Sequence, residues 1–152
     1  MHVRTASADD AEALEAVRLR GWQTAYRGIV GDAYLDALVV DADRRRERMA
    51  DPAVTTLVAV DDDEVVGMAV SGPSRDGLDA QELYALYVDP AAWRSGIGTA
   101  LLDALPDVAV LWVLSDNARA QAFYRRHGFE ADGRSQVLDL GGPVTEIRMR
   151  RG

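Results

Sequence analysis

Gly96 and Gly98 are the residues whose spacing most directly suggests chemistry. They follow an apolar, aromatic-rich run at residues 83–88 that predicts a strand, and they precede an Ala- and Leu-rich segment, stopped by Pro106, that predicts a helix. Glycines at such a turn let the main chain come close to a ligand, and the free N–H groups of a first helical turn favour an anion. The 94–99 turn is therefore predicted to bind a pyrophosphate group.

Two common nucleotide-binding motifs fit this turn less well. A P-loop requires Gly-Lys-Ser/Thr, and the chain contains no lysine. A dinucleotide-binding turn would have a third glycine where Leu101 stands, although Asp116 lies at about the right distance for the ribose acid. The loop 90–95 is also long for that motif, which normally enters its first glycine almost directly from the strand.

Length and composition indicate one ordinary domain over residues 1–152. The chain has 152 residues, of which 48% are hydrophobic and 28% charged, and this is enough to bury a core unaided. No apolar run approaches the ~20 residues of a membrane helix. The first residues include Asp9, Asp10 and Glu12 and lack the apolar core of a signal peptide. We therefore expect a cytoplasmic protein that does not bind membranes.

Composition also limits the cofactors and partners. The absence of cysteine excludes disulfides, thiolate metal sites and a Cys nucleophile, and two isolated histidines do not build a zinc site, so no metal is expected. A net charge of −8 argues against a nucleic-acid partner and favours cationic small molecules or basic peptide ends.

The remaining pattern predicts strands alternating with helices in an α/β layered domain. The acidic run 61–64 separates two β-branched runs and predicts a hairpin turn. The arginine-rich segment 41–50 predicts a solvated, salt-bridged helix. Strands are predicted at 3–5, 55–60, 65–71, 83–88, 108–114, 129–134, 135–140 and 145–149, and helices at 7–27, 31–38, 41–50, 98–105 and 118–126.

The 94–99 turn resembles motif A of the GNAT N-acetyltransferases, Gln/Arg-x-x-Gly-x-Gly/Ala after a strand and an Asp-Pro. Trp93 stands where the family usually has Gln or Arg. The residues that match the rest of the motif and the helix start are Arg94, Ser95, Gly96, Ile97, Gly98 and Thr99. The departure concerns a side-chain contact and leaves the main-chain binding turn unaffected.

A second segment carries the same resemblance. Residues 117–129, NARAQAFYRRHGF, are similar to the family pattern Asn-x-x-Ala-x-x-Phe-Tyr-x-x-x-Gly-Phe. The order of predicted elements also matches the GNAT fold along essentially the whole chain. The resemblance implies an α/β (α+β) fold with a mixed, mostly antiparallel sheet of six to seven strands, flanked by about four helices and splayed at its central strands.

The resemblance further implies that acetyl-CoA is the acetyl donor and that the chain is an N-acetyltransferase. In the family, main-chain groups of the strand before the turn bond the pantetheine arm and offer an N–H to the thioester oxygen, as an oxyanion hole does. By position, these groups belong to Leu86, Tyr87 and Val88.

Three side chains are candidates for the chemistry. The resemblance makes Tyr124 the proton donor to the leaving thiolate, and a neutral phenol suits that role; the alternative is a core aromatic residue. Asn117, two helical turns earlier, is a helix N-cap, a cofactor contact or both. Glu82 is a candidate base for the amine, and the alternatives are a solvated strand-end acid and proton removal by water.

The acceptor is expected to be an amine of a small molecule or a peptide. Acids at Asp32, Asp36, Asp76 and Asp79 are expected to give the acceptor groove, with Glu82, a field that attracts cations. Trp112 stands where relatives that acetylate ribosomal-protein N-termini place a glutamate, which weakens the case for such a substrate. A non-catalytic acyl-CoA sensor or subunit is the alternative function, and an exposed final strand makes a homodimer plausible.

Overall fold

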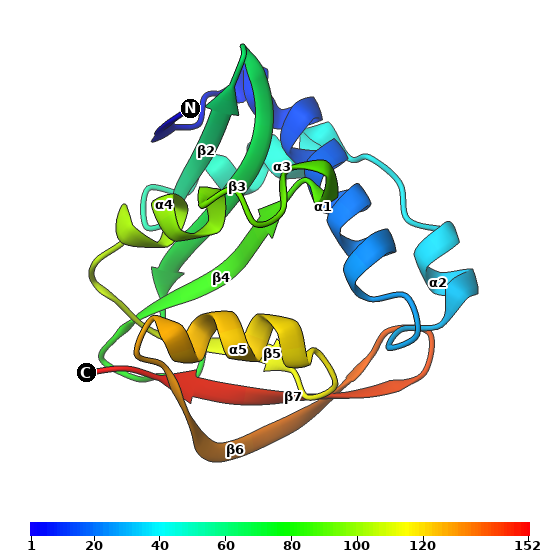
Figure 1. Ribbon diagram of the computed structural model, residues 1–152, viewed down its shortest axis with the longest axis vertical. Coiled ribbons are helices and arrows are strands. Elements are labelled where there is room, and N and C mark those ends of the chain that lie inside the picture. The colour runs from blue at the N-terminus through cyan, green and yellow to red at the C-terminus, as the bar shows by residue number, and fades with distance from the viewer.

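A mixed seven-stranded sheet runs through the molecule in a computed structural model that describes residues 1–152 (Figure 1). The strand order is β1-β2-β3-β4-β5-β7-β6, with β4 and β5 parallel and every other pair antiparallel. The predicted mixed, mostly antiparallel sheet is confirmed. The strands are β1 (His2–Thr5), β2 (Thr55–Asp61), β3 (Glu64–Pro73), β4 (Gln81–Val88), β5 (Val108–Leu114), β6 (Glu130–Asp139) and β7 (Pro143–Arg150).

Five α-helices flank the sheet, where about four were expected. None of them combines the length and apolar character needed to cross a lipid bilayer. The helices are α1 (Ala11–Ala25), α2 (Asp32–Asp36), α3 (Ala42–Met49), α4 (Ile97–Asp103) and α5 (Ala118–Arg126), with short 3-10 turns η1 (Ala8–Asp10) and η2 (Pro90–Ala92).

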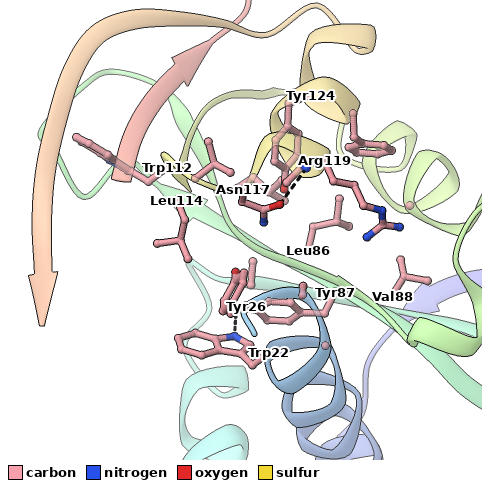
Figure 2. Close-up of a pocket in the computed structure, with 18 of the residues that line it drawn as sticks. Trp22, Tyr26, Leu86, Tyr87, Val88, Trp112, Leu114, Asn117, Arg119 and Tyr124 are labelled. Carbon is pink, nitrogen blue, oxygen red and sulfur yellow. Dashed lines mark hydrogen bonds between the residues drawn. The ribbon is translucent and has the colours of Figure 1, made fainter. Parts of the chain in front are cut away.

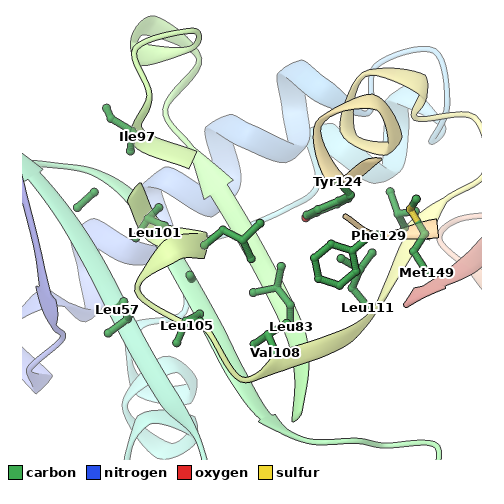
Figure 3. Close-up of a cluster of buried hydrophobic side chains, with 14 residues drawn as sticks. Leu57, Leu83, Ile97, Leu101, Leu105, Val108, Leu111, Tyr124, Phe129 and Met149 are labelled. Carbon is green, nitrogen blue, oxygen red and sulfur yellow. The ribbon is translucent and has the colours of Figure 1, made fainter. Parts of the chain in front are cut away.

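Helices cover both faces of the sheet. Alternate strand residues point to opposite sides, so apolar side chains of the same strand pack against helices on each face. Leu57 and Ala59 of β2 belong to the main core cluster, which lies with α4 and α5 (Figure 3). Val58 and Val60 belong to a second cluster with Leu14 of α1. A third, smaller cluster joins α2 to the ends of β5 and β7.

The parallel strands β4 and β5 separate soon after they meet. Gln81, Glu82 and Leu83 pair with β5, with an irregularity after Gln81, and no residue of β4 beyond Leu83 has a partner in β5. A second irregularity lies opposite Ser71, in the pairing of β4 with β3. Bulges bend a strand away from its neighbour, so the predicted splay of the central strands is observed.

Strong local signals give accurate helix ends. The Asn117 side chain accepts a hydrogen bond from the Ala120 N–H at 3.2 Å at the start of α5. Gly128, which follows the helix, has φ +89°, a conformation that favours glycine. By contrast, α1 ends at Ala25, before the predicted stop at Gly28.

The C-terminal strands differ from the prediction. Residues 129–134 and 135–140 were expected as two segments, but they form one long strand, β6, with an irregular register between Ala131 and Ser135. The final strand, β7, was expected to be an exposed edge; it lies between β5 and β6, and β6 is the edge. The dimerisation argument based on an exposed final strand therefore does not apply to β7.

The prediction of a fully solvated arginine face on α3 is wrong at one position. Arg45 is only 5% exposed, and it donates from Nε and Nη2 to Oε2 of the buried Glu15 at 3.1 and 2.9 Å. Because a charge is buried here only with a partner, this pair fixes α3 against α1.

Candidate active site

A cavity of about 950 Å³ occupies the opening between β4 and β5. Residues of α1, α4, α5 and all four of the strands β4 to β7 contribute to its lining. Trp22 and Tyr26 lie on one side of it, Asn117 and Tyr124 on the other, and Leu86 between them (Figure 2). The cavity therefore connects the two faces of the sheet.

One end of the cavity is the 94–99 turn, which has a row of unpaired main-chain donors. No N–H group from Arg94 through Thr99 donates a hydrogen bond within the protein. Arg94 (φ 66°) and Gly96 (φ 83°) both have left-handed main-chain conformations, which turn successive N–H groups to one side. A Cβ on Gly98 would lie 3.3 Å from the Phe123 ring, so glycine there lets α4 approach α5 closely.

Arginines surround this end of the cavity. The Arg119 guanidinium stacks 3.6 Å from the centre of the Trp93 ring. Burial, and then the positive charge of Arg94, lowers the pKa of Arg119. Arg126 also lines the cavity. Unpaired N–H groups beside cationic side chains are the donor set that a pyrophosphate requires.

Trp93 has a role that the sequence did not reveal. Its indole Nε1 donates to the Val88 carbonyl at 2.9 Å, and so joins the 94–99 turn to the end of β4. One acceptor position of Val88 is therefore already used, whereas no residue of β5 pairs with Leu86, Tyr87 or Val88. Main-chain groups alternate along a strand: those of Tyr87 point to Met68 of β3, and those of Leu86 and Val88, two of the three residues predicted to hold a pantetheine arm, lie along the edge that β5 leaves unpaired.

Tyr124 and Asn117 both line the cavity from α5. The Tyr124 hydroxyl has no hydrogen-bond partner in the protein, although the residue is only 8% exposed. The phenol of Tyr124 is protonated at neutral pH, as a free phenol is, and burial raises its pKa above that ordinary value. Asn117 caps the helix, as predicted, while its side chain also faces the cavity.

The opposite wall is aromatic. Trp22 Nε1 donates to the Tyr87 hydroxyl at 2.9 Å, and the Trp22 and Tyr26 rings meet edge to face at 4.9 Å (Figure 2). Burial, followed by the neighbouring Tyr87, Tyr124 and Glu146, raises the pKa of Tyr26. The Tyr26 hydroxyl is thus within electrostatic reach of groups on both sides of the sheet.

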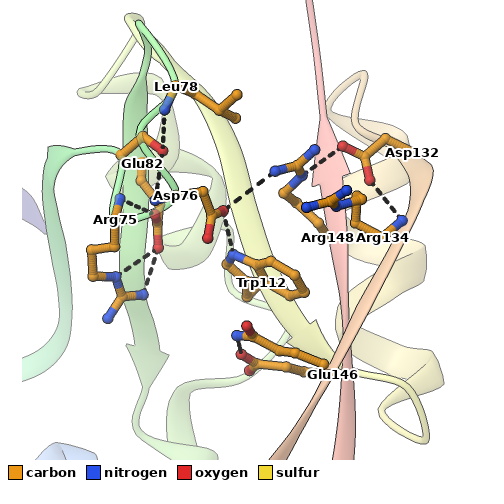
Figure 4. Close-up of polar contacts among 11 residues, drawn as sticks. Arg75, Asp76, Leu78, Glu82, Trp112, Asp132, Arg134, Glu146 and Arg148 are labelled. Atoms are coloured by element: carbon orange, nitrogen blue, oxygen red, sulfur yellow. Dashed lines mark hydrogen bonds and ion pairs between the residues drawn. The ribbon is translucent and has the colours of Figure 1, made fainter.

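The structure does not bring Glu82 into the cavity. Glu82 is fully buried and is absent from the cavity lining. The Arg75 N–H donates to Oε1 at 3.0 Å, and the Arg75 guanidinium donates to Oε2 from Nε at 2.9 Å and also from Nη2 (Figure 4). Both carboxylate oxygens are engaged, which leaves Glu82 as an anchor for the 74–80 loop.

The acids expected to attract cations are also largely engaged. Asp32 and Asp36 both pair with Arg27. Asp76 accepts from Trp112 Nε1 at 2.8 Å and from Arg148 at 3.5 Å (Figure 4). Arg27 and Arg148 therefore offset part of the predicted field, whereas the exposed Asp79 has no ion pair.

Glu146 is a cavity residue that the sequence did not single out. It lies on β7, opposite Leu114 of β5 and Gln136 of β6. The strand at 145–149 was predicted, and the alternation of its side chains between the two faces of the sheet could have placed Glu146 on one of those faces. Which strands lie beside it, however, is set by the strand order of the sheet, and the sequence of a single strand does not reveal that order.

Comparison with known proteins gives the family. Residues 18–129 match the model of the "Acetyltransferase (GNAT) family". The chain is 33% identical over 102 residues to the peptidyl-lysine N-acetyltransferase YjaB of Salmonella typhimurium, an alignment that covers 64% of this chain and 66% of that protein. It is 33% identical over 146 residues to the uncharacterised N-acetyltransferase Rv2669 of Mycobacterium tuberculosis, covering 87% and 90% of the two chains.

A solved structure supports the same fold. The PaiA N-acetyltransferase of Thermoplasma acidophilum, in complex with coenzyme A, superposes with a TM-score of 0.79 over 99% of this chain and 98% of its own, at 20% identity. The family match, the two N-acetyltransferase relatives and this fold agree with the splayed sheet and its cavity. The chain therefore belongs to the GNAT family of acetyltransferases, and its class of activity is N-acetyl transfer.

Proposed function

We propose that the protein transfers the acetyl group of acetyl-CoA directly to a primary amine of a small molecule or peptide while both substrates are bound. The observation that carries this proposal is the single cavity that runs from the unpaired N–H groups of the 94–99 turn, through the opening between β4 and β5, to the aromatic wall of α1. Such a cavity has room for a donor on one face of the sheet and an acceptor on the other.

The residues present fit acetyl-CoA as the donor substrate, which supplies the thioester. The N–H groups of Arg94, Ser95, Gly96, Ile97, Gly98 and Thr99 bind the pyrophosphate. Arg119 adds positive charge beside them, and the unpaired main chain of Leu86 and Val88 holds the pantetheine arm. An N–H of this β4 edge, at Leu86 or Val88 on either side of Tyr87, polarises the thioester carbonyl. Asn117 contributes a polar contact from the start of α5.

Tyr124 acts as the general acid. As the amine nitrogen forms its bond to the acetyl carbon, the carbon–sulfur bond breaks and the sulfur leaves as a thiolate. The Tyr124 hydroxyl, which lines the cavity without a protein partner and is protonated at neutral pH, gives its proton to that sulfur. For Glu82 to serve as the base, its ion pair with Arg75 would have to open first.

The acceptor class rests on the relatives and on the cavity. The protein YjaB is named a peptidyl-lysine N-acetyltransferase, and an amine at the end of a flexible side chain suits the aromatic wall formed by Trp22 and Tyr26. A small-molecule amine would fit the same wall.

A thiol-release assay over a panel of amines tests this function. We expect coenzyme A release that depends on the amine and matches the amount of acetylated product. Assays without amine measure background hydrolysis. Binding of acetyl-CoA by calorimetry, with no amine-dependent release across polyamines, aminoglycosides, amino acids and lysine peptides, would instead support the alternative of a non-catalytic acyl-CoA-binding module.

A further inference from the structure

Glu146 is one of two carboxylates that line the cavity, and the other is Asp76. Asp76 is held by Trp112 and Arg148. Glu146 accepts one hydrogen bond, from Gln136 Nε2 to Oε1, and its Oε2 has no partner in the protein (Figure 4). No histidine lines the cavity. Each of the two carboxylates therefore has one oxygen without a protein partner, Oε2 of Glu146 and Oδ1 of Asp76, but only Glu146 has no ion pair with an arginine.

The register of β7 puts Glu146 on the acceptor side of the sheet. Val144, two residues earlier, packs in the cluster that contains α2 and the aromatic residues of α1. Ile147, on the opposite face, packs in the cluster that contains Tyr124. Because side chains alternate along a strand, Glu146 and Tyr124 approach the cavity from opposite faces of the sheet.

The charged surroundings of Glu146 suit a carboxylate that exchanges protons. Burial raises its pKa, the Gln136 hydrogen bond and Arg75 lower it, and Glu82 and Asp76 raise it, with a net increase. Of the other elements packed around it, α1 presents the phenol of Tyr26, and β5 and β6 present uncharged residues. The titratable and charged groups near it are therefore Tyr26, Arg75, Asp76 and Glu82, together with Arg148, which lies two residues along β7 on the same face and pairs with Asp76.

We propose that Glu146 is the general base that removes a proton from the acceptor ammonium, directly or through one water; this rests on the function proposed above. The carboxylate takes one proton from the ammonium, and the neutral amine attacks the thioester carbon. The nitrogen gives its second proton to water as the carbon–nitrogen bond forms and the carbon–sulfur bond breaks. The thiolate gains a proton from Tyr124, which takes one back from water, and Glu146 gives its proton to solvent, so that one proton in total is released.

The Glu146→Gln variant keeps the shape of the side chain and its position beside Gln136 while removing the base. We expect the turnover number to fall by ~10²-fold or more, because general bases contribute about that factor, with unchanged acetyl-CoA affinity by calorimetry. The matched control is Glu130→Gln, an exposed glutamate on β6 that does not line the cavity. A rise in KM with an unchanged turnover number would show an ammonium-binding residue and overturn the role as base.

A second variant tests the base without relying on lost activity. Replacing Gln136 with Met removes the donor that stabilises the Glu146 carboxylate, so its titration, followed by carbon NMR of labelled glutamate, should move to higher pH. The acidic limb of the kcat/KM profile should move by the same amount. An NMR titration that moves while the limb stays in place would assign the limb to another group and contradict the proposal.

The two proposals fail in different ways. Full activity in Glu146→Gln, in a wild-type protein that acetylates amines, overturns only the role of Glu146. Absence of amine-dependent thiol release from the wild-type protein overturns the proposed function, and the role of Glu146 with it.

Discussion

Tyr124 combines the two properties that a proton donor in this cavity requires. Its hydroxyl has no protein partner, so it is available to a substrate, and it carries a proton at neutral pH, as a free phenol does and as burial, which raises its pKa, further favours. Its ring meanwhile packs edge to face with Phe123 and Phe129, at 5.4 and 5.9 Å. The packing and the chemistry therefore belong to different atoms of the same side chain.

This separation predicts the result of Tyr124→Phe. The ring contacts remain, so stability and acetyl-CoA affinity should change little, while the turnover number should fall ~10²-fold or more. Steady-state kinetics and calorimetry on the same preparation measure both quantities. A wild-type turnover number, with chemistry shown to be rate-limiting, would leave Tyr124 as a core aromatic residue.

Gly96 tests the 94–99 turn. At φ 83° any side chain adds strain of about 1 kcal/mol, and a carboxylate would also repel the pyrophosphate. We expect Gly96→Asp to abolish acetyl-CoA binding by calorimetry. Gly133→Asp is the matched control, because Gly133 has φ 87° and also has open space around it but lies on β6 away from the cavity. Equal affinities in the two folded variants would refute the assignment.

At the scale of secondary structure, features set by residues adjacent in sequence were predicted more accurately than features set by long-range contacts. The ends of α5 were predicted correctly because an Asn cap and a following glycine lie next to the helix in sequence. The place of β7 inside the sheet was wrong because strand order is set by long-range pairing. For the same reason, the sequence did not identify Glu146 as a cavity residue, because its neighbours come from two other strands.

The misread helix α3 shows a related limit. Its arginines alternate with acids, which is typical of an exposed helix, and the buried Arg45 cannot be told from its neighbours without knowing where α1 lies. In the structure, burial acts to raise the pKa of Glu15, but hydrogen bonds from Arg18 and Arg45 outweigh it and the pKa is lowered. Glu15 is therefore ionised and depends on its arginine partners.

Removal of one partner should be costly. Arg45→Ala leaves the buried Glu15 carboxylate with fewer donors, and we expect a loss of about 3–5 kcal/mol in the free energy of unfolding. Arg44→Ala, at an exposed position of the same helix, should change it by less than about 1 kcal/mol. Urea denaturation of both variants measures the difference, and equal losses would indicate that the Glu15–Arg45 pair adds no specific stability.

For the molecule as a whole, the net charge of −8 overstates how strongly the acceptor side attracts cations. Most acids near that side are paired with arginines, and the exceptions are the exposed Asp79 and the cavity residue Glu146. Selectivity for the acceptor is then expected to depend on the aromatic wall and one carboxylate more than on a general field. A homodimer stays a prediction, and the sheet edges available for it are β1 and β6.

In the proposed mechanism, one cavity through the splayed sheet holds donor and acceptor together, so that the acetyl group moves between them in one step. Initial rates measured while acetyl-CoA and the best amine of the panel are both varied test it most directly. We predict double-reciprocal lines that intersect, with one coenzyme A released for each acetylated amine. Parallel lines, which indicate an acetylated enzyme intermediate and release of coenzyme A before the amine binds, would contradict the account.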